Sequence, residues 1–263
     1  MAEVLAKKGL NVLLVSRTPS KLQEVKDDIL RMTKETVKVD TLAIDFDNFD
    51  GKKQKDVEAA ISKINVGVLV NNVGMSYKFA KYFHELDMGD VDQMTRLNVD
   101  STGRMTYIVL QHMLAKQKKN KGCIVNMSSS AARFANPLLA QYSGTKGYIE
   151  NLTASLATEY GPKGVQFQCQ SPLFVTTKLA KIQRKYSSVT TPTPEIYAKS
   201  AVAHIGYETL VSPYWAHALM LAVARHLPDF VLQGGLMSMH LKIRSKGRKK
   251  DEKLAAEKGS KGH

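Results

Sequence analysis

Short apolar runs alternate with longer, more polar stretches through most of this chain. The apolar runs have the length of strands, and they occupy residues 10–16, 37–44, 66–70, 123–127 and 165–170. The stretches between them predict helices at 19–32, 52–64, 90–116 and 142–160. Buried strands that alternate with helices are typical of an α/β fold with a parallel sheet.

The chain has the size of one domain with a basic end. With 263 residues, 43% of them hydrophobic, it can bury one substantial core, so we expect a single domain at 1–241. Residues 242–263 hold nine basic and three acidic side chains, a large part of the net charge of +14. Their Lys-, Gly- and Glu-rich composition predicts a disordered basic tail.

The sequence as given predicts neither a spanning helix nor a leader, because it contains no apolar run of eighteen residues. The apolar segment 227–241 is interrupted by Pro228 and Asp229, so we expect it to lie on a membrane rather than to cross one. The basic tail beside it would attract anionic lipid headgroups, or would act only as a solubilising tail. Nucleic-acid binding is disfavoured because no recognition motif accompanies the charge.

The cysteines and the acidic turn indicate no disulfide and no metal site. Cys123 and Cys169 both lie in apolar runs, which predicts buried free thiols and a reducing compartment. Asp47, Asn48 and Asp50 lack the glutamate that closes a calcium loop, so they predict a polar turn.

The stretch from 123 to 146 contains the candidate chemistry. The predicted strand 123–127 leads to Ser129, and the helix that follows carries Tyr142 and Lys146. Residues four apart share a helical face, and a neighbouring ammonium favours the phenolate, so this pair suits general acid–base catalysis. A serine hydroxyl beside the phenol can hydrogen-bond a substrate carbonyl, as carbonyl reduction requires. The alternative for an isolated pair of this kind is a solvated surface contact.

Four ordered motifs resemble those of the short-chain dehydrogenase/reductase family. Ser129 precedes Tyr142 by thirteen residues, and Tyr142 and Lys146 form the pattern Y-x-x-x-K. The other three motifs are Asn71-Asn72-Val73-Gly74, which resembles N-N-A-G; Leu97-Asn98-Val99, which resembles the segment with the catalytic Asn; and residues 172–177, which resemble P-G-x-V-x-T. The resemblance extends from residue 1 to about residue 240.

The resemblance implies a set of catalytic residues in which Tyr142 donates the proton. In this set Lys146 holds ribose hydroxyls and lowers the pKa of the phenol, while Asn98 bends its helix and holds the water of a proton relay. The catalytic residues expected are Asn98, Ser129, Tyr142 and Lys146.

The expected cofactor is NADP(H). Arg17 follows the first predicted strand with no acidic residue beside it, and a basic side chain at this point of a dinucleotide fold suits a 2′-phosphate. Lys21 is a second basic candidate. The resemblance adds an aspartate near the adenine and two residues that face the nicotinamide amide. The cofactor-binding residues expected are Arg17, Asp45, Asn72, Gly74, Tyr142, Lys146, Val175 and Thr177.

The sequence departs from the family pattern at two places. Leu173 stands where the motif has glycine, which puts the local backbone geometry in question. The family also opens with a strand and a glycine-rich turn that holds the pyrophosphate, whereas Met1 falls within the helix after that turn. That strand is central in the family's 3-2-1-4-5-6-7 sheet. We therefore expect a Rossmann-type doubly wound parallel sheet with the first strand missing, in an N-terminally truncated domain.

Residues 209–220, with residues 137–139 and the lysine-rich end, resemble one branch of the family, the membrane-associated very-long-chain 3-oxoacyl-CoA reductases and their 17β-hydroxysteroid dehydrogenase relatives. The branch implies NADPH-dependent reduction of 3-oxoacyl-CoA in fatty-acid elongation, at the cytosolic face of the endoplasmic reticulum membrane. A 17β-hydroxysteroid dehydrogenase is the alternative enzyme, although a basic surface suits anionic CoA better than a steroid. An inactive fragment or a non-catalytic interaction protein is the alternative from another class.

Two longer stretches predict how substrate and partners bind. The polar, proline-containing stretch 176–207 is expected to form a substrate lid. Helices equivalent to 90–116 and 142–160 pair subunits in the family. The resemblance therefore leaves room for a homodimer and for partners in an elongation complex.

Overall fold

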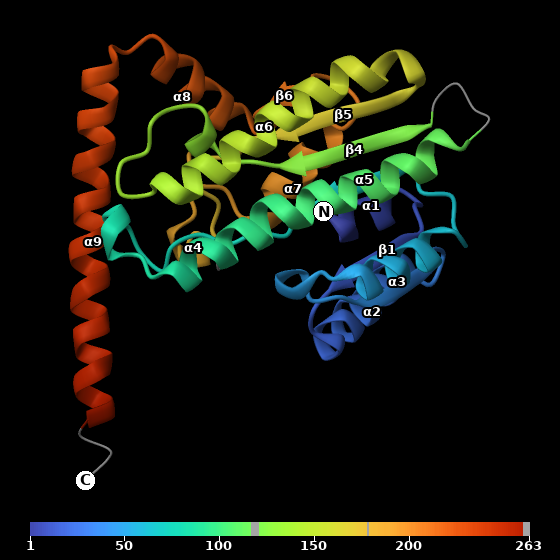
Figure 1. Cartoon of the computed structure of the whole chain (residues 1–263), viewed down its shortest axis with the longest axis horizontal. Helices are drawn as coiled ribbons and strands as arrows, with labels where there is room; N and C mark the ends of the chain where they lie inside the picture. Colours follow the sequence, from blue (N-terminus) through green and yellow to red (C-terminus); the bar gives the residue numbers. More distant parts are fainter. Residues whose placement is uncertain (117–120, 178, 260–263) are drawn as a thin grey trace.

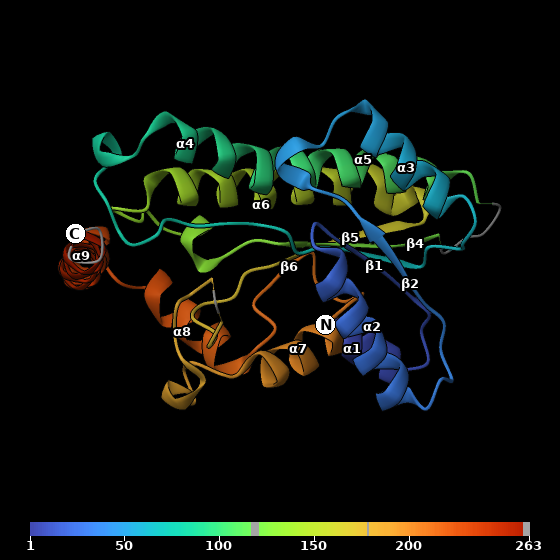
Figure 2. The same cartoon turned by 90° about the horizontal axis from the view of Figure 1, so that it is seen from below.

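The computed structural model describes residues 1–116, 121–177 and 179–259, and it has a layered α/β architecture. Figure 2 shows helices on both sides of the strands. One side carries α3 (Gly51–Ile61), α4 (Met88–Thr95), α5 (Ser101–Leu114) and α6 (Ala140–Tyr160), and the other carries α1 (Ala2–Lys7), α2 (Pro19–Thr33), α7 (Pro194–Ala203) and α8 (Trp215–Arg225). The predicted α/β class is confirmed.

The strands form two parallel sheets. β1 (Val12–Ser16) pairs with β2 (Val39–Ala43). The second sheet has the order β3-β4-β5-β6, made of β3 (Val68–Asn71), β4 (Gly122–Met127), β5 (Val165–Gln170) and β6 (Leu210–Val211). Within the described residues no ladder joins β1 to β3. The sheet is thus interrupted where the family's first strand would lie, as the sequence predicts.

Helices on one face hold the two sheets together across this interruption. Leu13 and Val15 of β1 pack into the main core beside the buried Val57 of α3 and Val109 of α5. Val12 and Leu14, which point to the opposite face, pack with α1 and α2. Burial of each large aliphatic side chain stabilises the fold by about 1.5–3 kcal/mol. On the face of α3 and α5 one hydrophobic cluster is therefore continuous across both sheets, although the sheet itself is interrupted.

A π turn divides the predicted helix 90–116. Residues Arg96–Asp100 form this turn between α4 and α5, and Asn98 at its centre is fully buried. Such π bulges occur frequently at functional sites. The remaining short helical turns are of the 3₁₀ type: η1 (Phe46–Asn48), η2 (Phe83–Glu85), η4 (Ser130–Ala132), η5 (Gly161–Lys163) and η6 (Arg184–Tyr186).

The C-terminal segment differs from the disordered tail that composition predicts. Residues Asp229–Gly259 form the long helix α9, which stands at one side of the molecule in Figure 1, while residues 260–263 lie outside the described residues. Specific contacts with the rest of the protein explain why this segment forms an ordered helix. Arg244 pairs with Glu85, and a Cβ added at Gly247 would lie only 2.3 Å from the Phe79 ring, so the helix packs closely there.

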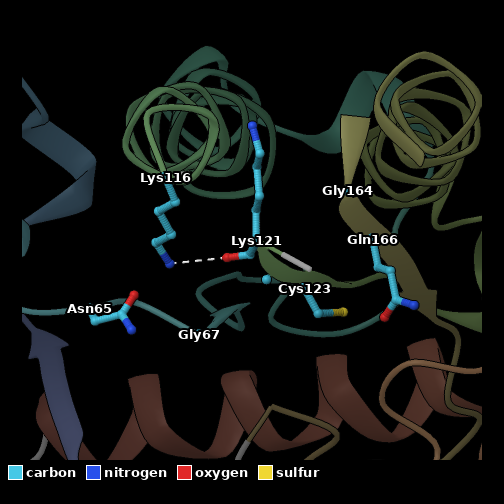
Figure 3. A pocket seen from close by; sticks show the side chains of 8 residues that line it. Asn65, Gly67, Lys116, Lys121, Cys123, Gly164 and Gln166 are labelled. Carbon is cyan, nitrogen blue, oxygen red and sulfur yellow. Dashed lines mark hydrogen bonds between the residues drawn. The ribbon is translucent and has the colours of Figure 1, made fainter. Parts of the chain in front are cut away.

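A cavity of about 320 Å³ opens at the amino ends of β4 and β5 (Figure 3). Two lysines that line it are bonded to backbone oxygens. Lys116 Nζ donates to the Lys121 carbonyl at 3.0 Å, and Lys121 Nζ donates to the Leu114 carbonyl at 3.0 Å. Parallel α/β sheets bind their ligands at the carboxyl ends of strands, so this cavity lies at the wrong end of the sheet for the predicted chemistry.

The predicted buried thiols are present. Cys123 and Cys169 are both buried and free. Burial raises the pKa of Cys123 to about 11 and that of Cys169 to about 12, so both thiols stay protonated at neutral pH.

Candidate active site

The four predicted catalytic residues lie at the carboxyl end of the second sheet. Ser129 follows β4, Tyr142 and Lys146 lie on α6, and Asn98 lies in the π turn. Helix α6 packs against this turn, against η4 and against β5. The carboxyl edge of the strands is the ligand-binding edge of parallel α/β sheets. The structure therefore brings the four side chains together where a substrate is expected.

Asn98 connects three segments around the site. Its Oδ1 accepts a hydrogen bond from the Met75 amide at 2.8 Å, and its Nδ2 donates to the Met75 carbonyl at 3.0 Å. Nδ2 also donates to Thr145 Oγ1 at 2.9 Å, next to Lys146 on α6. A fully buried amide with these partners is well satisfied. The side chain thus fastens the loop after β3 and helix α6 to the π turn.

The phenol of Tyr142 and the hydroxyl of Ser129 meet. Burial raises the pKa of Tyr142, and the hydrogen bond with Ser129 opposes that rise. Ser129 is held in place by its own N-capping contact, in which its Oγ accepts from the Ala131 amide at 3.2 Å. Two hydroxyl groups therefore converge on the space that a carbonyl oxygen would occupy.

Lys146 is buried below the phenol, and its side chain is 4% exposed. Its Nζ donates to the Met127 carbonyl at 2.9 Å and lies 5.9 Å from the centroid of the Tyr142 ring. Burial lowers the pKa of Lys146 to about 8. The resemblance predicts that Lys146 lowers the pKa of the phenol. In the structure, burial raises the pKa of Tyr142 instead, and the Lys146 ammonium is bonded to the Met127 carbonyl.

Gly74 lies between Asn98 and Lys146. A Cβ at this position would come within 2.9 Å of Asn98 Oδ1 and 3.4 Å of Lys146 Nζ. Only glycine lets the backbone approach both side chains without displacing them. Asn72 is exposed just past the end of β3, whereas Asn71 is buried and donates to Asn126 Oδ1 of β4 at 2.8 Å. The first asparagine of the motif therefore braces the sheet, and the second remains accessible.

Leu173 does not adopt the left-handed backbone conformation that favours glycine, since it is not one of the described residues with positive φ. Its amide donates to Nδ1 of the fully buried His217 at 3.3 Å, and Nε2 of that ring contacts the Thr190 carbonyl at 3.2 Å. Val175 is buried beside Met127 in a small apolar cluster. The histidine thus ties the loop after β5 to the predicted lid.

Thr177 turns back on its own loop. Its amide donates to the Val175 carbonyl at 2.7 Å, and its Oγ1 accepts from the Ala180 amide at 3.1 Å. The neighbouring Thr176 Oγ1 is buried without a hydrogen-bond partner in the described structure. A buried hydroxyl of this kind is a candidate for a ligand contact.

Sequence reasoning missed an ion pair beside the predicted catalytic residues. Glu150 lies four residues after Lys146 on the same face of α6, and its Oε1 lies 2.8 Å from Arg133 Nε, with both side chains 13% exposed. Ser171, at the end of β5, also donates to Glu150. The pair connects α6 with the segments that follow Ser129 and β5. The four-residue spacing of positions 142, 146 and 150 was the signal in the sequence that could have placed Glu150 on this face.

The predicted adenosine-side residues lie on the other sheet. Arg17 is exposed after β1, and Asp45 is exposed after β2, where its side chain accepts from the Asp47 amide at 3.1 Å. Hydrogen bonds from Gln93 and Arg96 lower the pKa of Asp47, and the charge of Arg17 lowers it further. Arg17 therefore lies near the loop after β2, while the predicted catalytic residues lie at the carboxyl end of the second sheet.

Comparison with known proteins agrees with this geometry. The family described as short chain dehydrogenase matches residues 1–187. A very-long-chain 3-oxoacyl-CoA reductase-like protein of Arabidopsis thaliana is 38% identical over 250 residues, which cover 93% of this chain and 78% of that protein. The very-long-chain 3-oxoacyl-CoA reductase of Homo sapiens is 37% identical over 258 residues, which cover 96% and 78%.

Solved structures share the fold at lower identity. A short-chain dehydrogenase from Sphingobium yanoikuyae in complex with NADPH matches with a TM-score of 0.70 and 22% identity, covering 90% of this chain and 89% of that one. A bulky-bulky ketone specific alcohol dehydrogenase from Comamonas testosteroni matches with a TM-score of 0.69 and 23% identity, covering 90% and 87%.

Proposed function

This chain belongs to the short-chain dehydrogenase family, and we propose that it is an NADPH-dependent reductase of 3-oxoacyl-CoA thioesters. The proposed reaction gives 3-hydroxyacyl-CoA and serves very-long-chain fatty-acid elongation. The observation that carries the proposal is the convergence of Ser129, Tyr142 and Lys146 at one edge of the sheet, in a chain 37–38% identical to reductases of that name.

In this reaction Tyr142 donates a proton to the oxygen of the C3 carbonyl, and Ser129 orients that oxygen by a hydrogen bond. NADPH, when bound, supplies the hydride. With a pKa of about 8, Lys146 is mainly charged at neutral pH and still exchanges its proton readily. Its charge stabilises the phenolate after proton transfer. Asn98 holds the π turn and α6 in register and thereby keeps the proton relay in place.

The residues present fit NADP(H) at both of its ends. At the nicotinamide end, Gly74 leaves the backbone open and the buried Thr176 hydroxyl lacks a partner in the described structure. Lys146 would hold the ribose hydroxyls, with Val175 and Thr177 beside the nicotinamide amide. At the adenosine end, the exposed Arg17 would hold the 2′-phosphate.

For the pyrophosphate, we propose that a strand and a glycine-rich turn precede Met1 in the whole protein. The interrupted sheet supports this, since a strand between β1 and β3 would pair their facing backbone groups. Met1 also packs against the cluster that contains Val175, so a preceding turn would lie next to the cofactor loop. The matched relatives are longer than this chain, since the aligned region covers 93–96% of this chain but only 78% of each relative.

NADPH oxidation tests the proposal. The chain of 263 residues and the chain extended by its upstream coding sequence, called the extended chain below, are each assayed with a long-chain 3-oxoacyl-CoA and with a 17-ketosteroid. We expect turnover of the acyl-CoA by the extended chain only. The names of the relatives do not favour the steroid dehydrogenase, and steroid turnover without acyl-CoA turnover would reverse that preference. A folded extended chain that reduces neither substrate would point to an interaction protein.

We further propose attachment to the cytosolic face of the endoplasmic reticulum membrane. Trp215, Leu219 and Val223 are exposed one turn apart on α8, and Leu227 and Phe230, which follow α8 in the chain, are exposed as well. None of the helices in the described ranges has the length and hydropathy that crossing a bilayer requires. Basic side chains of α9 would meet anionic headgroups. Co-sedimentation with anionic vesicles should fall when Trp215 and Phe230 become serine, and unchanged co-sedimentation would reject this surface.

A homodimer through α5 and α6 is the remaining proposal about partners. Tyr107 of α5 and Tyr148 of α6 are 66% and 42% exposed, and large aromatic side chains are enriched at protein interfaces. Light scattering should give the mass of a dimer, and a Tyr107→Lys variant should reduce it to that of a monomer. A monomeric parent would reject the homodimer, and pull-down of elongation enzymes would test the wider complex.

A further inference from the structure

One cluster of charged side chains lies outside the catalytic residues. Lys78 comes from the loop after β3, Lys181 from the segment after Thr177, and Lys250 and Asp251 from α9. Lys78 Nζ lies 2.7 Å from Asp251 Oδ1. Lys181 Nζ donates to the carbonyl of Lys78 as well, so three segments distant in the sequence meet at this point.

The cluster carries more positive than negative charge. Partial burial lowers the pKa of Lys181, and the nearby charges of Lys78 and Lys250 lower it further, while the carboxylate of Asp251 raises it. Like charges held close together repel each other, and a bound anion would relieve that repulsion. The arrangement is therefore suited to a ligand with several negative charges.

The cluster also lies beside the elements that surround Tyr142. Lys181 Nζ donates to the Tyr77 carbonyl at 3.2 Å, and the hydroxyl of Tyr77 accepts from the Gln141 amide at 2.9 Å. Helix α9 contacts the same region, because His240 Nδ1 donates to the Pro137 carbonyl at 2.7 Å. Figure 1 shows α9 at the side of the molecule away from β1, the strand that Arg17 follows.

We propose that Lys78, Lys181 and Lys250 bind the phosphate groups of the coenzyme A part of the substrate. This inference rests on the proposed function. In a 3-oxoacyl-CoA the reacting carbonyl lies at one end of the pantetheine arm and the phosphorylated nucleotide at the other. A carbonyl bound at Tyr142 would extend its arm between the loop after β3 and the lid, with the phosphates at the lysines. Ammonium groups are effective phosphate ligands as point charges.

A comparison of two thioesters tests the site. The extended chain is assayed with a 3-oxoacyl-CoA and with the pantetheine thioester of the same acyl chain, which carries no phosphate. The test variants are Lys250→Gln alone and combined with Lys78→Gln, and the control is Lys199→Gln at an exposed position of α7. We expect the double variant to raise KM for the CoA thioester about tenfold and the control to leave it unchanged. KM for the pantetheine thioester should not move.

The outcomes separate this inference from the proposed function. Equal effects of the lysine substitutions on both thioesters, or none on either, would overturn the phosphate site while turnover itself still supports the reductase. If neither thioester is reduced, calorimetric titration of the protein with coenzyme A and with pantetheine decides the matter. Lysine-dependent binding of coenzyme A alone would support the site, and its absence would reject it. Loss of binding to anionic vesicles with unchanged CoA kinetics would assign the lysines to lipid instead.

Discussion

Asn98 and Met75 exchange two hydrogen bonds, one in each direction. The amide of Met75 donates to Asn98 Oδ1 at 2.8 Å, and Asn98 Nδ2 donates to the carbonyl of Met75 at 3.0 Å. A side-chain amide that pairs with a backbone peptide in this way fixes the loop after β3 against the π turn. Because Nδ2 also reaches Thr145, the same residue positions the helix that carries Tyr142 and Lys146.

Replacing Asn98 with alanine should therefore lower both stability and turnover. A buried backbone group left without its partner costs about 1–3 kcal/mol, so we expect a loss on the order of 3 kcal/mol in the free energy of unfolding. Urea denaturation measures it, with Asn151→Ala at an exposed position of α6 as the control. Equal stability of the two variants would show that the two hydrogen bonds between Asn98 and Met75 do not stabilise the fold.

Tyr142→Phe removes the proposed proton donor and keeps the ring. General acid catalysis contributes about 10²–10⁴-fold, so turnover of the 3-oxoacyl-CoA by the extended chain should fall by that factor. The affinity for NADPH, followed by fluorescence titration, should stay the same. Tyr160→Phe, at the last residue of α6 and far from Tyr142 along the helix, serves as the control. Turnover that survives in Tyr142→Phe would refute the assigned role.

Lys146→Met should stabilise the protein at neutral pH. Burial lowers the pKa of Lys146 from its ordinary 10.5 to about 8, so below pH 8 the folded state holds a disfavoured charge at a cost of about 3 kcal/mol. The lost hydrogen bond to Met127 offsets about 1 kcal/mol of the gain. Between pH 8 and 10.5 the unfolded chain binds more protons than the folded one, so the parent gains stability as pH rises.

Guanidinium denaturation of the parent and the variant at pH 7 and pH 10 measures this difference. The advantage of Lys146→Met should shrink at the higher pH, whereas Lys199→Met at an exposed site should show no such trend. Turnover should be lost in Lys146→Met at both pH values, as is common where a destabilised residue serves function. A stability difference independent of pH would contradict the buried charge.

The sequence predicted the local elements well because each depends on its own residues. The strand at 165–170 and the spacing of Tyr142 and Lys146 follow from nearby side chains alone. Helix α9 was missed because its order depends on partners far away in the chain. Arg244 and Glu85, which form its ion pair, are 159 residues apart, and composition alone made the segment look disordered.

The π turn at Asn98 was anticipated only through the family resemblance. An asparagine in a helix interior is locally unfavourable, and residue preferences do not reveal which distant backbone group will satisfy it. The contribution of His217 was hidden for the same reason, since its partners Leu173 and Thr190 belong to other segments. The replacement of the motif glycine by Leu173 was visible in the sequence, but the contact of the Leu173 amide with His217 was not.

Arg17→Glu tests the preference for NADPH over NADH. A lost charge-assisted hydrogen bond costs about 1.5–3 kcal/mol. The KM for NADPH divided by the KM for NADH should therefore rise by about 10–100-fold. Lys21→Glu introduces the same change of charge on the exposed face of α2 and is the matched control. A change of this KM ratio in Lys21→Glu, with none in Arg17→Glu, would assign 2′-phosphate binding to Lys21.

Gly247→Leu should detach α9 from the domain. A Cβ at Gly247 would lie 2.3–2.7 Å from the Phe79 ring, so the helix has to move away, and the Arg244–Glu85 pair and the contact between His240 and Pro137 are lost with it. Hydrogen exchange of the α9 amides should become roughly tenfold faster, because local opening then costs less free energy.

The matched control for this change is Gly235→Leu on the same helix. A Cβ at Gly235 meets nothing within 4 Å, and leucine favours helix over glycine, so exchange in α9 should stay the same or slow down. If the two variants exchange equally, the close approach of Gly247 to Phe79 does not hold α9. If only Gly247→Leu also raises KM for the CoA thioester, the docked helix contributes to substrate binding, as the position of Lys250 requires.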